Sequence, residues 1–289
     1  MKKFKFWFNC VCLMLPFIIP CQSHATETAA LVSDVTGHVT IKANGSSSPA
    51  KLLTSIPLGA KVDLAAGAKL TMIYVAKGDE YNLTGPGVYQ LDASSPQTIN
   101  GAAPTSISGA LTGKKIRLGS VTQASSTMRE GIKETSGPLG PLTPSDSITL
   151  ADPLQLRWHA PADGLAYSIQ IINSKNEVLF SKEMTGNTFT LPAGIPLSSG
   201  SYYIWNITTT MPDGSPLSDS AKFKVASSGI REQAAKLKPG KNGAVSERVT
   251  YGLWLEGANL ADEAIHVWVD LAEDYTDEPN IRDRANPKP

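Results

Sequence analysis

Several residue types are scarce in this sequence of 289 residues, and each scarcity narrows the expected function. Aromatic residues make up only 7%, and 26 basic residues balance 26 acidic ones, so the net charge is zero. A neutral chain lacks the basic stripe of nucleic-acid-binding domains, so nucleic acid is not expected as a partner. The three cysteines all lie within the first 25 residues. With 41% apolar residues, the chain is long enough for about two domains with cores of their own.

The first 25 residues have the pattern of a secretory signal peptide. The first five residues include three lysines, and an apolar stretch follows over Phe6–Ile19. Ser23-His24-Ala25 then places small residues at both key positions of a signal peptidase site. We therefore expect a bacterial signal peptide over residues 1–25, cleavage after Ala25, and a periplasmic or secreted protein.

Two other fates of this segment agree less well with its residues. Lipoprotein processing at Cys21 requires a small residue before the cysteine, and Pro20 stands there. An uncleaved anchor is interrupted by Pro16 and Pro20, so no stable membrane span is expected after cleavage. The mature chain then has no Cys, which excludes disulfides, Cys-ligated metals and a Cys nucleophile. It keeps 23 basic and 26 acidic residues, a net charge of −3.

Residues 29–92 contain short alternating apolar runs without a helical period. Gly and Pro separate the runs, which is typical of a small antiparallel β domain. Lys77-Gly78-Asp79 predicts a hairpin turn between the runs at 70–75 and 80–84. We expect the domain to extend over 26–122, with Leu111–Val121 closing it as a strand or hairpin.

The glycine spacing of this domain resembles a known family. The segments that carry the resemblance are Val35-Thr36-Gly37-His38-Val39, Leu58-Gly59-Ala60-Lys61-Val62, Lys69–Val75 and Tyr81–Tyr89. Over about residues 30–92 they resemble a FecR-type periplasmic domain. Because these positions are turn glycines and alternating apolar residues, the resemblance implies a fold more than a function.

A linker is predicted over residues 123–146. No Phe, Trp or Tyr occurs between Ala93 and Asp146, and Ser, Thr, Gly, Pro and Ala dominate. This composition is typical of an extended, flexible connection, most clearly at Ser136–Pro141. A small basic cluster could meet an anionic surface, although a solvated face explains four charges more simply. Its residues are Lys114, Lys115, Arg117 and Arg129.

Residues 147–226 predict a β-sandwich of the immunoglobulin or fibronectin-III type. Short alternating runs recur with a turn about every ten residues, which is the pattern of that architecture. The spacing from Leu197 through Gly200, Tyr203, Trp205 and Ile207 resembles the sixth strand of these modules. The resemblance implies that Tyr203 is a tyrosine-corner residue whose hydroxyl binds nearby backbone.

Two tryptophans of this domain fit either a core or a sugar-stacking surface. Trp158 and Trp205 both lie at the apolar positions of their strands. Core packing is therefore the favoured interpretation.

The apolar period changes to a helical one after Ser228. A short helix ending at Pro239-Gly240 and a helical hairpin with its turn at Gly257–Leu260 are expected within 229–278. Gly252, Ala264 and Trp268 resemble the small and aromatic positions of a single tetratricopeptide repeat. The tail over 279–289 is predicted to be disordered.

Charge is distributed unevenly along this helical part. Residues 256–283 hold nine acids and one Arg, whereas residues 231–248 hold five bases and two acids. Solvated faces explain this distribution most simply, with pairing of the two helical parts or an acidic face for a partner as alternatives.

Motifs that would carry catalysis or cofactor binding are missing from the sequence. The mature chain has three histidines, His38, His159 and His266, each in a different module. No G-x-S-x-G elbow, P-loop or dinucleotide fingerprint occurs. We therefore predict no catalytic, cofactor-binding or metal-binding residues.

The leading hypothesis is a non-catalytic binding or scaffolding protein of the cell envelope. Its fold would be mainly β, with a FecR-like domain, an immunoglobulin-like sandwich and a C-terminal helical hairpin. The expected partner is another envelope protein, with a glycan or peptidoglycan as the second candidate. A carbohydrate-binding role would use Tyr74, Tyr89 or Tyr202 as a platform, and a hydrolase with a dispersed site is the third hypothesis.

Overall fold

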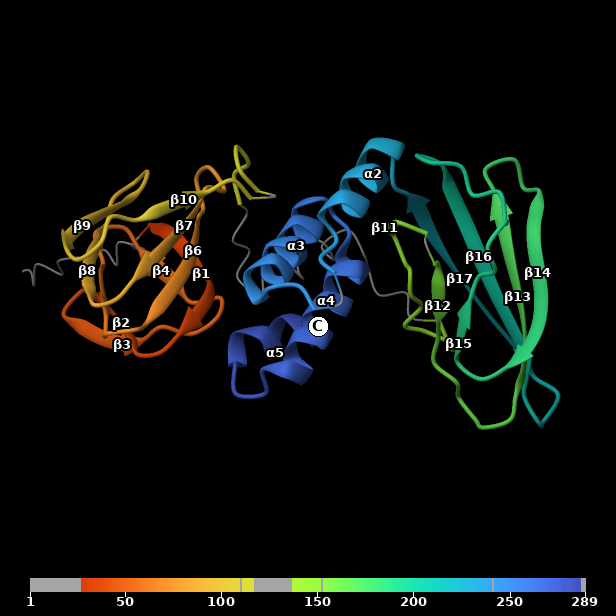
Figure 1. The fold of residues 1–289 in the computed structure, drawn as a ribbon. Coiled ribbons are helices and arrows are strands. Elements are labelled where there is room, and N and C mark those ends of the chain that lie inside the picture. Colours follow the sequence, from red (N-terminus) through yellow and green to blue (C-terminus); the bar gives the residue numbers. More distant parts are fainter. Residues whose placement is uncertain (1–26, 110, 117–136, 152, 241, 287–289) are drawn as a thin grey trace, which may run out of the picture.

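The computed structural model of the chain describes residues 27–109, 111–116, 137–151, 153–240 and 242–286. Figure 1 shows two β domains with a group of helices between them. The expected fold class is confirmed, because the chain is mainly β with antiparallel sheets and C-terminal helices. The predicted signal peptide and its cleavage position at Ala25 lie outside the described residues.

Over residues 27–109 the first β domain forms two five-stranded antiparallel sheets. One sheet has the strand order β10-β7-β6-β1-β4 and the other the order β3-β2-β5-β8-β9. Val32, Met72, Val62 and Tyr89 pack in the core between the sheets. The strands are β1 (Thr28–Thr36), β2 (Val39–Ala43), β3 (Ser46–Pro49), β4 (Ser55–Pro57), β5 (Lys61–Leu64), β6 (Lys69–Tyr74), β7 (Glu80–Thr84), β8 (Gly87–Leu91), β9 (Pro96–Asn100) and β10 (Thr105–Ile107).

The predicted hairpin at residues 77–79 is confirmed. Strands β6 and β7 pair antiparallel, with Leu70 opposite Leu83. Gly78 has a φ of +67°, and a Cβ at this position would collide with the carbonyl oxygen of Leu111. Glycine is therefore required at this turn both for the backbone angle and for the close approach of the chain.

Over residues 147–225 the second β domain is a sandwich. A five-stranded sheet has the order β11-β17-β16-β13-β14, with β11 parallel to β17, and it faces the two-stranded sheet β12-β15. The strands are β11 (Ser147–Thr149), β12 (Gln155–Arg157), β13 (Ala166–Asn173), β14 (Val178–Thr185), β15 (Thr188–Thr190), β16 (Tyr202–Thr210) and β17 (Pro216–Val225). This arrangement fits an immunoglobulin-like module, as the strand pattern predicted.

The aromatic residues of this sandwich occupy its core, as predicted. Trp158 and Trp205 are 4% and 0% exposed, so core packing accounts for both. The backbone N–H of Ser198 donates to the hydroxyl oxygen of Tyr203 at 2.6 Å. The predicted contact between the Tyr203 hydroxyl and nearby backbone is therefore present.

The linker prediction is wrong for the part of residues 123–146 that the structure describes. Leu139 is fully buried and Leu142 is 9% exposed, both in the core of the sandwich. The indole N–H of Trp205 donates to the carbonyl of Pro144 at 2.8 Å. This segment is ordered because its leucines are buried against apolar side chains of the sandwich. Its Gly- and Pro-rich composition does not reveal this burial.

The C-terminal part forms a helical layer of α2 (Ser228–Leu237), α3 (Val245–Gly257), α4 (Ala261–Asp274) and α5 (Pro279–Ala285). The short helix and the α3–α4 hairpin agree with the predicted periodicity. Gly252 on α3 faces Trp268 on α4, and a Cβ at Gly252 would lie 2.6 Å from the Trp268 ring. The small residue thus allows the two helices to pack closely.

The disordered tail predicted over 279–289 is wrong for residues 279–285. These residues form α5, which begins with Pro279 in its first turn. Ile281 is fully buried in the helical layer, and the side-chain amide of Asn280 donates to the carbonyl of Leu52 at 3.0 Å. The burial of Ile281 and this contact to the first β domain account for the order of the segment.

Candidate binding surfaces and the helical layer

The helical layer packs against the first β domain through strands β1 and β6. Leu31 and Ile73 point into the core that contains Leu255 and Trp268, whereas Val32 and Met72 point into the core between the sheets. Because side chains alternate along a strand, β1 and β6 are buried on both faces. The helices therefore form a third layer on the first β domain.

A buried carboxylate reinforces this contact. Glu80 on β7 is 7% exposed, and the hydroxyl of Thr250 on α3 donates to it at 3.0 Å. Burial raises the pKa of Glu80, and the hydrogen bond from Thr250 opposes that rise.

On its other side the helical layer contacts β11 of the sandwich mainly through α4. Glu263 accepts hydrogen bonds from the Thr149 hydroxyl at 2.8 Å and from the Leu150 backbone N–H at 2.6 Å. Its second carboxylate oxygen is buried without a hydrogen-bond partner among the described residues. Burial raises the pKa of Glu263, and these two hydrogen bonds offset part of the rise. The hydroxyl of Ser147 donates to the neighbouring Asp262 at 3.1 Å.

The same side of the helical layer carries one of the three histidines. The Nη2 atom of Arg157 on β12 lies 2.9 Å from the Nε2 atom of His266 on α4. Because a guanidinium can only donate, Nε2 accepts and the ring is neutral in this contact. Partial burial, and then the charge of Arg157, lower the pKa of His266.

The three histidines lie in different modules, as the sequence indicated. His38 follows β1, and the backbone N–H of His159 donates to Leu139. Within the described part of the chain, no group of three or more His, Cys, Asp or Glu residues could hold a metal ion.

The tyrosine platform proposed for carbohydrate is wrong for two of its three members. Tyr74 and Tyr89 are 1% and 0% exposed. Tyr74 packs edge-on against Tyr81, and the hydroxyl of Tyr89 lies 2.9 Å from the carbonyl oxygens of Thr84 and Ala102. Both rings lie at inward positions of their strands, so they fill the core and cannot receive a sugar.

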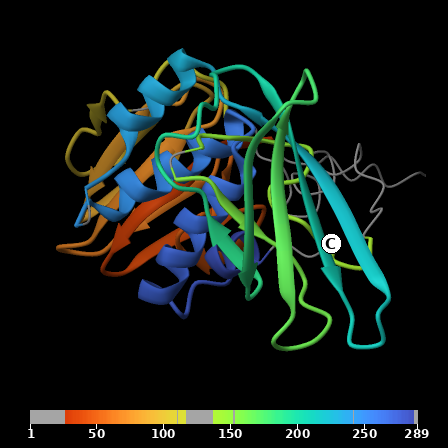
Figure 2. The same ribbon diagram turned by 90° about the vertical axis from the view of Figure 1, so that its right-hand side faces the viewer.

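Tyr202 remains exposed, and it belongs to an apolar patch on the outer face of the five-stranded sheet. Tyr202, Ile204 and Val178 are 49%, 40% and 55% exposed. Ile172 lies between Ile204 and Val178, since it pairs with both across the strands. We call Tyr202, Ile204, Ile172 and Val178 the sheet-face patch. Figure 2 views this side of the sandwich, and no helix lies in front of β13, β14 and β16.

Two lysines of β17 border the sheet-face patch. Lys222 pairs with Ile204 and Lys224 with Tyr202. Their amino groups lie 4.4 Å and 5.1 Å from the centre of the Tyr202 ring, which is cation–π geometry. The patch therefore combines an apolar centre with a positively charged side.

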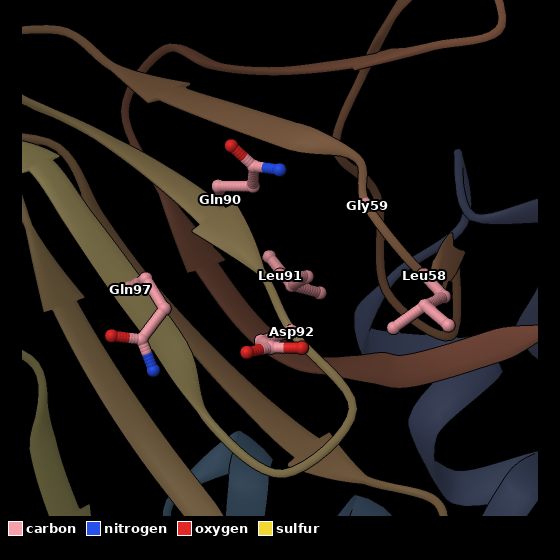
Figure 3. A pocket seen from close by; sticks show the side chains of 6 residues that line it. All are labelled: Leu58, Gly59, Gln90, Leu91, Asp92 and Gln97. Carbon is pink, nitrogen blue, oxygen red and sulfur yellow. The ribbon is translucent and has the colours of Figure 1, made fainter.

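The first β domain has a shallow hollow of about 410 Å³ on its surface. Figure 3 shows the side chains that line it, with Gln90, Gln97 and Asp92 around the apolar Leu58 and Leu91. Two amides and a carboxylate can hydrogen-bond a polar ligand. No local sequence pattern reveals this group, because its members come from three separate segments.

The charges singled out in the sequence have varied surroundings. Lys114 lies over the Trp254 ring at 5.7 Å, and Arg117 and Arg129 lie outside the described residues. Arg248 on α3 pairs with Asp274 on α4 at 2.5 Å, so part of the helical charge is paired internally.

Among the helices that the structure describes, none is long and apolar enough to cross a membrane.

Comparisons with known proteins identify no family for the chain. No protein-family model matches it, and a search of curated proteins finds no match. A cell surface anchoring domain has 18% identity and a TM-score of 0.22, covering 26% of this chain and 99% of that domain. CopC from Methylosinus trichosporium OB3b has 20% identity and a TM-score of 0.25, covering 31% of this chain and 93% of CopC.

A third solved structure is similar over more of the chain. It is a beta-1,2-glucanase from Parabacteroides distasonis, with 10% identity and a TM-score of 0.25. The similarity covers 86% of this chain and 39% of the glucanase. TM-scores this low carry no argument about function.

Proposed function

We propose that the chain is a non-catalytic binding or scaffolding protein of the bacterial periplasm or cell envelope, with a FecR-like domain at its N-terminal end. The pattern of an export signal over residues 1–25 supports the location. The glycine spacing over residues 30–92, on two antiparallel sheets, supports the FecR-like assignment.

The observation that carries the scaffolding role is the helical layer between the two β domains. Its core takes Leu31 and Ile73 from the first β domain, and Ile148 and Leu150 of the second pack against the same core. The carboxylates of the buried Glu80 and the partly buried Glu263 accept hydrogen bonds from across these contacts. These hydrogen bonds connect the helical layer to both β domains. Such an arrangement suits a scaffold that presents its outer surfaces to partners.

Affinity capture tests this function. The protein would be exported with its own signal, purified, immobilised and exposed to solubilised envelope proteins, and separately to peptidoglycan sacculi. We expect a specific envelope protein to be retained, at a level that survives competition by the free protein. If neither an envelope protein nor peptidoglycan is retained, the proposed function is wrong.

The surface hollow of the first β domain favours peptidoglycan or another glycan as the second candidate ligand. Gln90, Gln97 and Asp92 offer hydrogen-bond donors and acceptors around Leu58 and Leu91. A Gln90→Ala/Gln97→Ala variant should then lose retention on sacculi, whereas Gln155→Ala, at a partly buried glutamine of the other domain, should not. Equal retention of all three proteins would reject a glycan site at this hollow.

A further inference from the structure

The sheet-face patch and its two lysines form a surface that fits a protein better than a sugar. Ile204, Ile172 and Val178 are aliphatic and offer no hydrogen bonds. The amino groups of Lys222 and Lys224 already lie over the Tyr202 ring, where a sugar would have to stack. An apolar centre bordered by charge is typical of a protein–protein contact.

The charge on this surface is not neutralised within the described part of the chain. Neither Lys222 nor Lys224 takes part in the ion pairs found there, which join Lys42 to Asp63, Arg248 to Asp274 and Arg284 to Glu256. A partner that supplies carboxylates would therefore gain attraction without having to break an existing ion pair.

Helix α4 presents a surface with the matching properties. Val269 is 38% exposed, and the exposed Glu273 lies four residues further on, on the same face of the helix; the exposed Asp270 neighbours Glu273 at a spacing of three residues. Among the described residues neither acid forms an ion pair. This acidic helix face, Val269, Asp270 and Glu273, thus combines an apolar residue with two acids that form no ion pair in the described part of the chain.

One molecule cannot bring these two surfaces together. In Figure 1 the strands β12 and β15 lie between α4 and the strands β13 and β14. The sheet-face patch is on the opposite, outer side of the five-stranded sheet, which Figure 2 shows without a helix in front. A contact between the two surfaces therefore requires two molecules.

We propose that a second copy of this chain docks its acidic helix face on the sheet-face patch. Lys222 and Lys224 of one molecule would face Asp270 and Glu273 of the next, and Val269 would pack against Ile204 and its neighbours. The proposal rests on the scaffolding function and names one partner of that scaffold.

Such a contact is heterologous, because two different surfaces meet. After two molecules have bound, one still has a free sheet-face patch and the other a free acidic helix face, so the assembly grows into a ring or a filament. The apolar area is small compared with the roughly 800 Å² per partner of a standard interface. The association is therefore weak and depends on protein concentration and salt.

Sedimentation equilibrium of the full protein, exported and purified from the periplasm, tests the proposal. At low ionic strength the average mass should increase with concentration. It should return to the monomer at about 1 M salt, where charges are screened within about 3 Å. A protein that stays monomeric at every concentration at low salt overturns the inference, while leaving capture of other envelope proteins as the separate test of the proposed function.

Charge reversal identifies the surfaces. Lys222→Glu/Lys224→Glu and Asp270→Lys/Glu273→Lys should each weaken self-association at least about tenfold, because like charges then face each other. The control Lys61→Glu/Lys69→Glu makes the same charge change on the first β domain and should associate like the wild type. A control that weakens association equally would show a net-charge effect and would overturn the assignment.

Mixing the variants gives the decisive result. The two charge-reversed proteins should each associate weakly alone but are complementary to each other, so an equimolar mixture should assemble again. A variant carrying all four substitutions should also assemble by itself. If neither the mixture nor the fourfold variant recovers self-association, these two surfaces do not bind each other. Circular dichroism of every variant shows whether the fold is kept.

Discussion

The helical layer contacts the two β domains in different ways. Toward the first domain the contact is mainly apolar, since Leu31 and Ile73 enter the core of the layer. Toward the sandwich, Ile148 and Leu150 also pack against the layer, but polar contacts are added: Glu263 accepts hydrogen bonds from Thr149 and Leu150, and the Arg157–His266 pair lies at the edge. An apolar contact depends on buried area alone, whereas a polar contact also depends on geometry and ionisation. We therefore expect the contact with the sandwich to be the weaker and more condition-dependent of the two.

The largest effect is expected from truncating the apolar contact. Ile73→Ala removes a fully buried side chain and should cost about 2–5 kcal/mol in the free energy of unfolding, because it leaves a cavity. Urea denaturation measures this cost. The exposed Val178→Ala serves as the control and should change stability by less than about 0.5 kcal/mol. A cost for Ile73→Ala no larger than the control's would show that the layer is not packed on the first domain.

An effect of intermediate size is expected for the pH dependence of stability, which the contact with the sandwich influences. Burial raises the pKa of Glu263 above the 4.5 of an unperturbed Glu. The contribution of this group to stability is fully present below pH 4.5 and is lost as the pH rises through the higher folded value. The melting temperature of the wild type should therefore fall as the pH rises from about 4.5 through the higher folded pKa, and Glu263→Gln should reduce that fall.

Two matched variants make this pH test specific. Glu273→Gln changes an exposed Glu on the same helix and should leave the pH dependence as in the wild type. Glu80→Gln removes the acid at the contact with the first β domain, whose pKa burial also raises, and should act in the same direction as Glu263→Gln. A Glu263→Gln protein with an unchanged pH dependence would contradict the polar character assigned to the contact with the sandwich.

The smallest effect is expected from Arg157→Ala at the edge of this polar contact. Arg157 is exposed, so the loss should be about 0.2–1 kcal/mol. The positive charge of Arg157 lowers the pKa of His266, so its removal should raise that pKa. An NMR titration of His266 measures the shift, with Lys175→Ala as an exposed control. An unchanged His266 titration in Arg157→Ala would mean that the two side chains do not meet in solution.

Local structure was largely predictable from the sequence. The turn at Gly78 follows from its turn residues, and the helices α2, α3 and α4 follow from their apolar spacing. Tyr203 lies at the inward position that its motif implied. These features depend on neighbours in the sequence, which is why local patterns reveal them.

Contacts between distant segments were not predicted. Leu139 and Ile281 were assigned to a linker and a disordered tail because their surroundings are polar or rich in Gly and Pro, yet each is buried against elements far along the chain. The sequence does contain one indication that a further layer covers the first β domain. Strands β1 and β6 contain nearly continuous apolar runs, and such runs are typical of strands covered on both faces.

The candidate surfaces were predictable only in part. Tyr202 was among the candidate platform residues, but sequence alone could not separate it from Tyr74 and Tyr89. Its position does carry information, because Tyr202 and Ile204 alternate with the core residues Tyr203 and Trp205. A strand with apolar residues on both of its faces is either covered by a second layer or leaves one apolar face exposed.

The place of the helical layer has a consequence for biosynthesis. Its helices follow both β domains in the chain, yet they lie between them, and Thr250 meets Glu80 across 170 residues. Domains fold as units in the order in which they emerge, so both β domains can be complete before the helices that join them appear. The contacts between the helical layer and the two β domains would then form last, because they close the longest loops. A chain that ends after the sandwich would contain both folded β domains without the helical layer that packs against them.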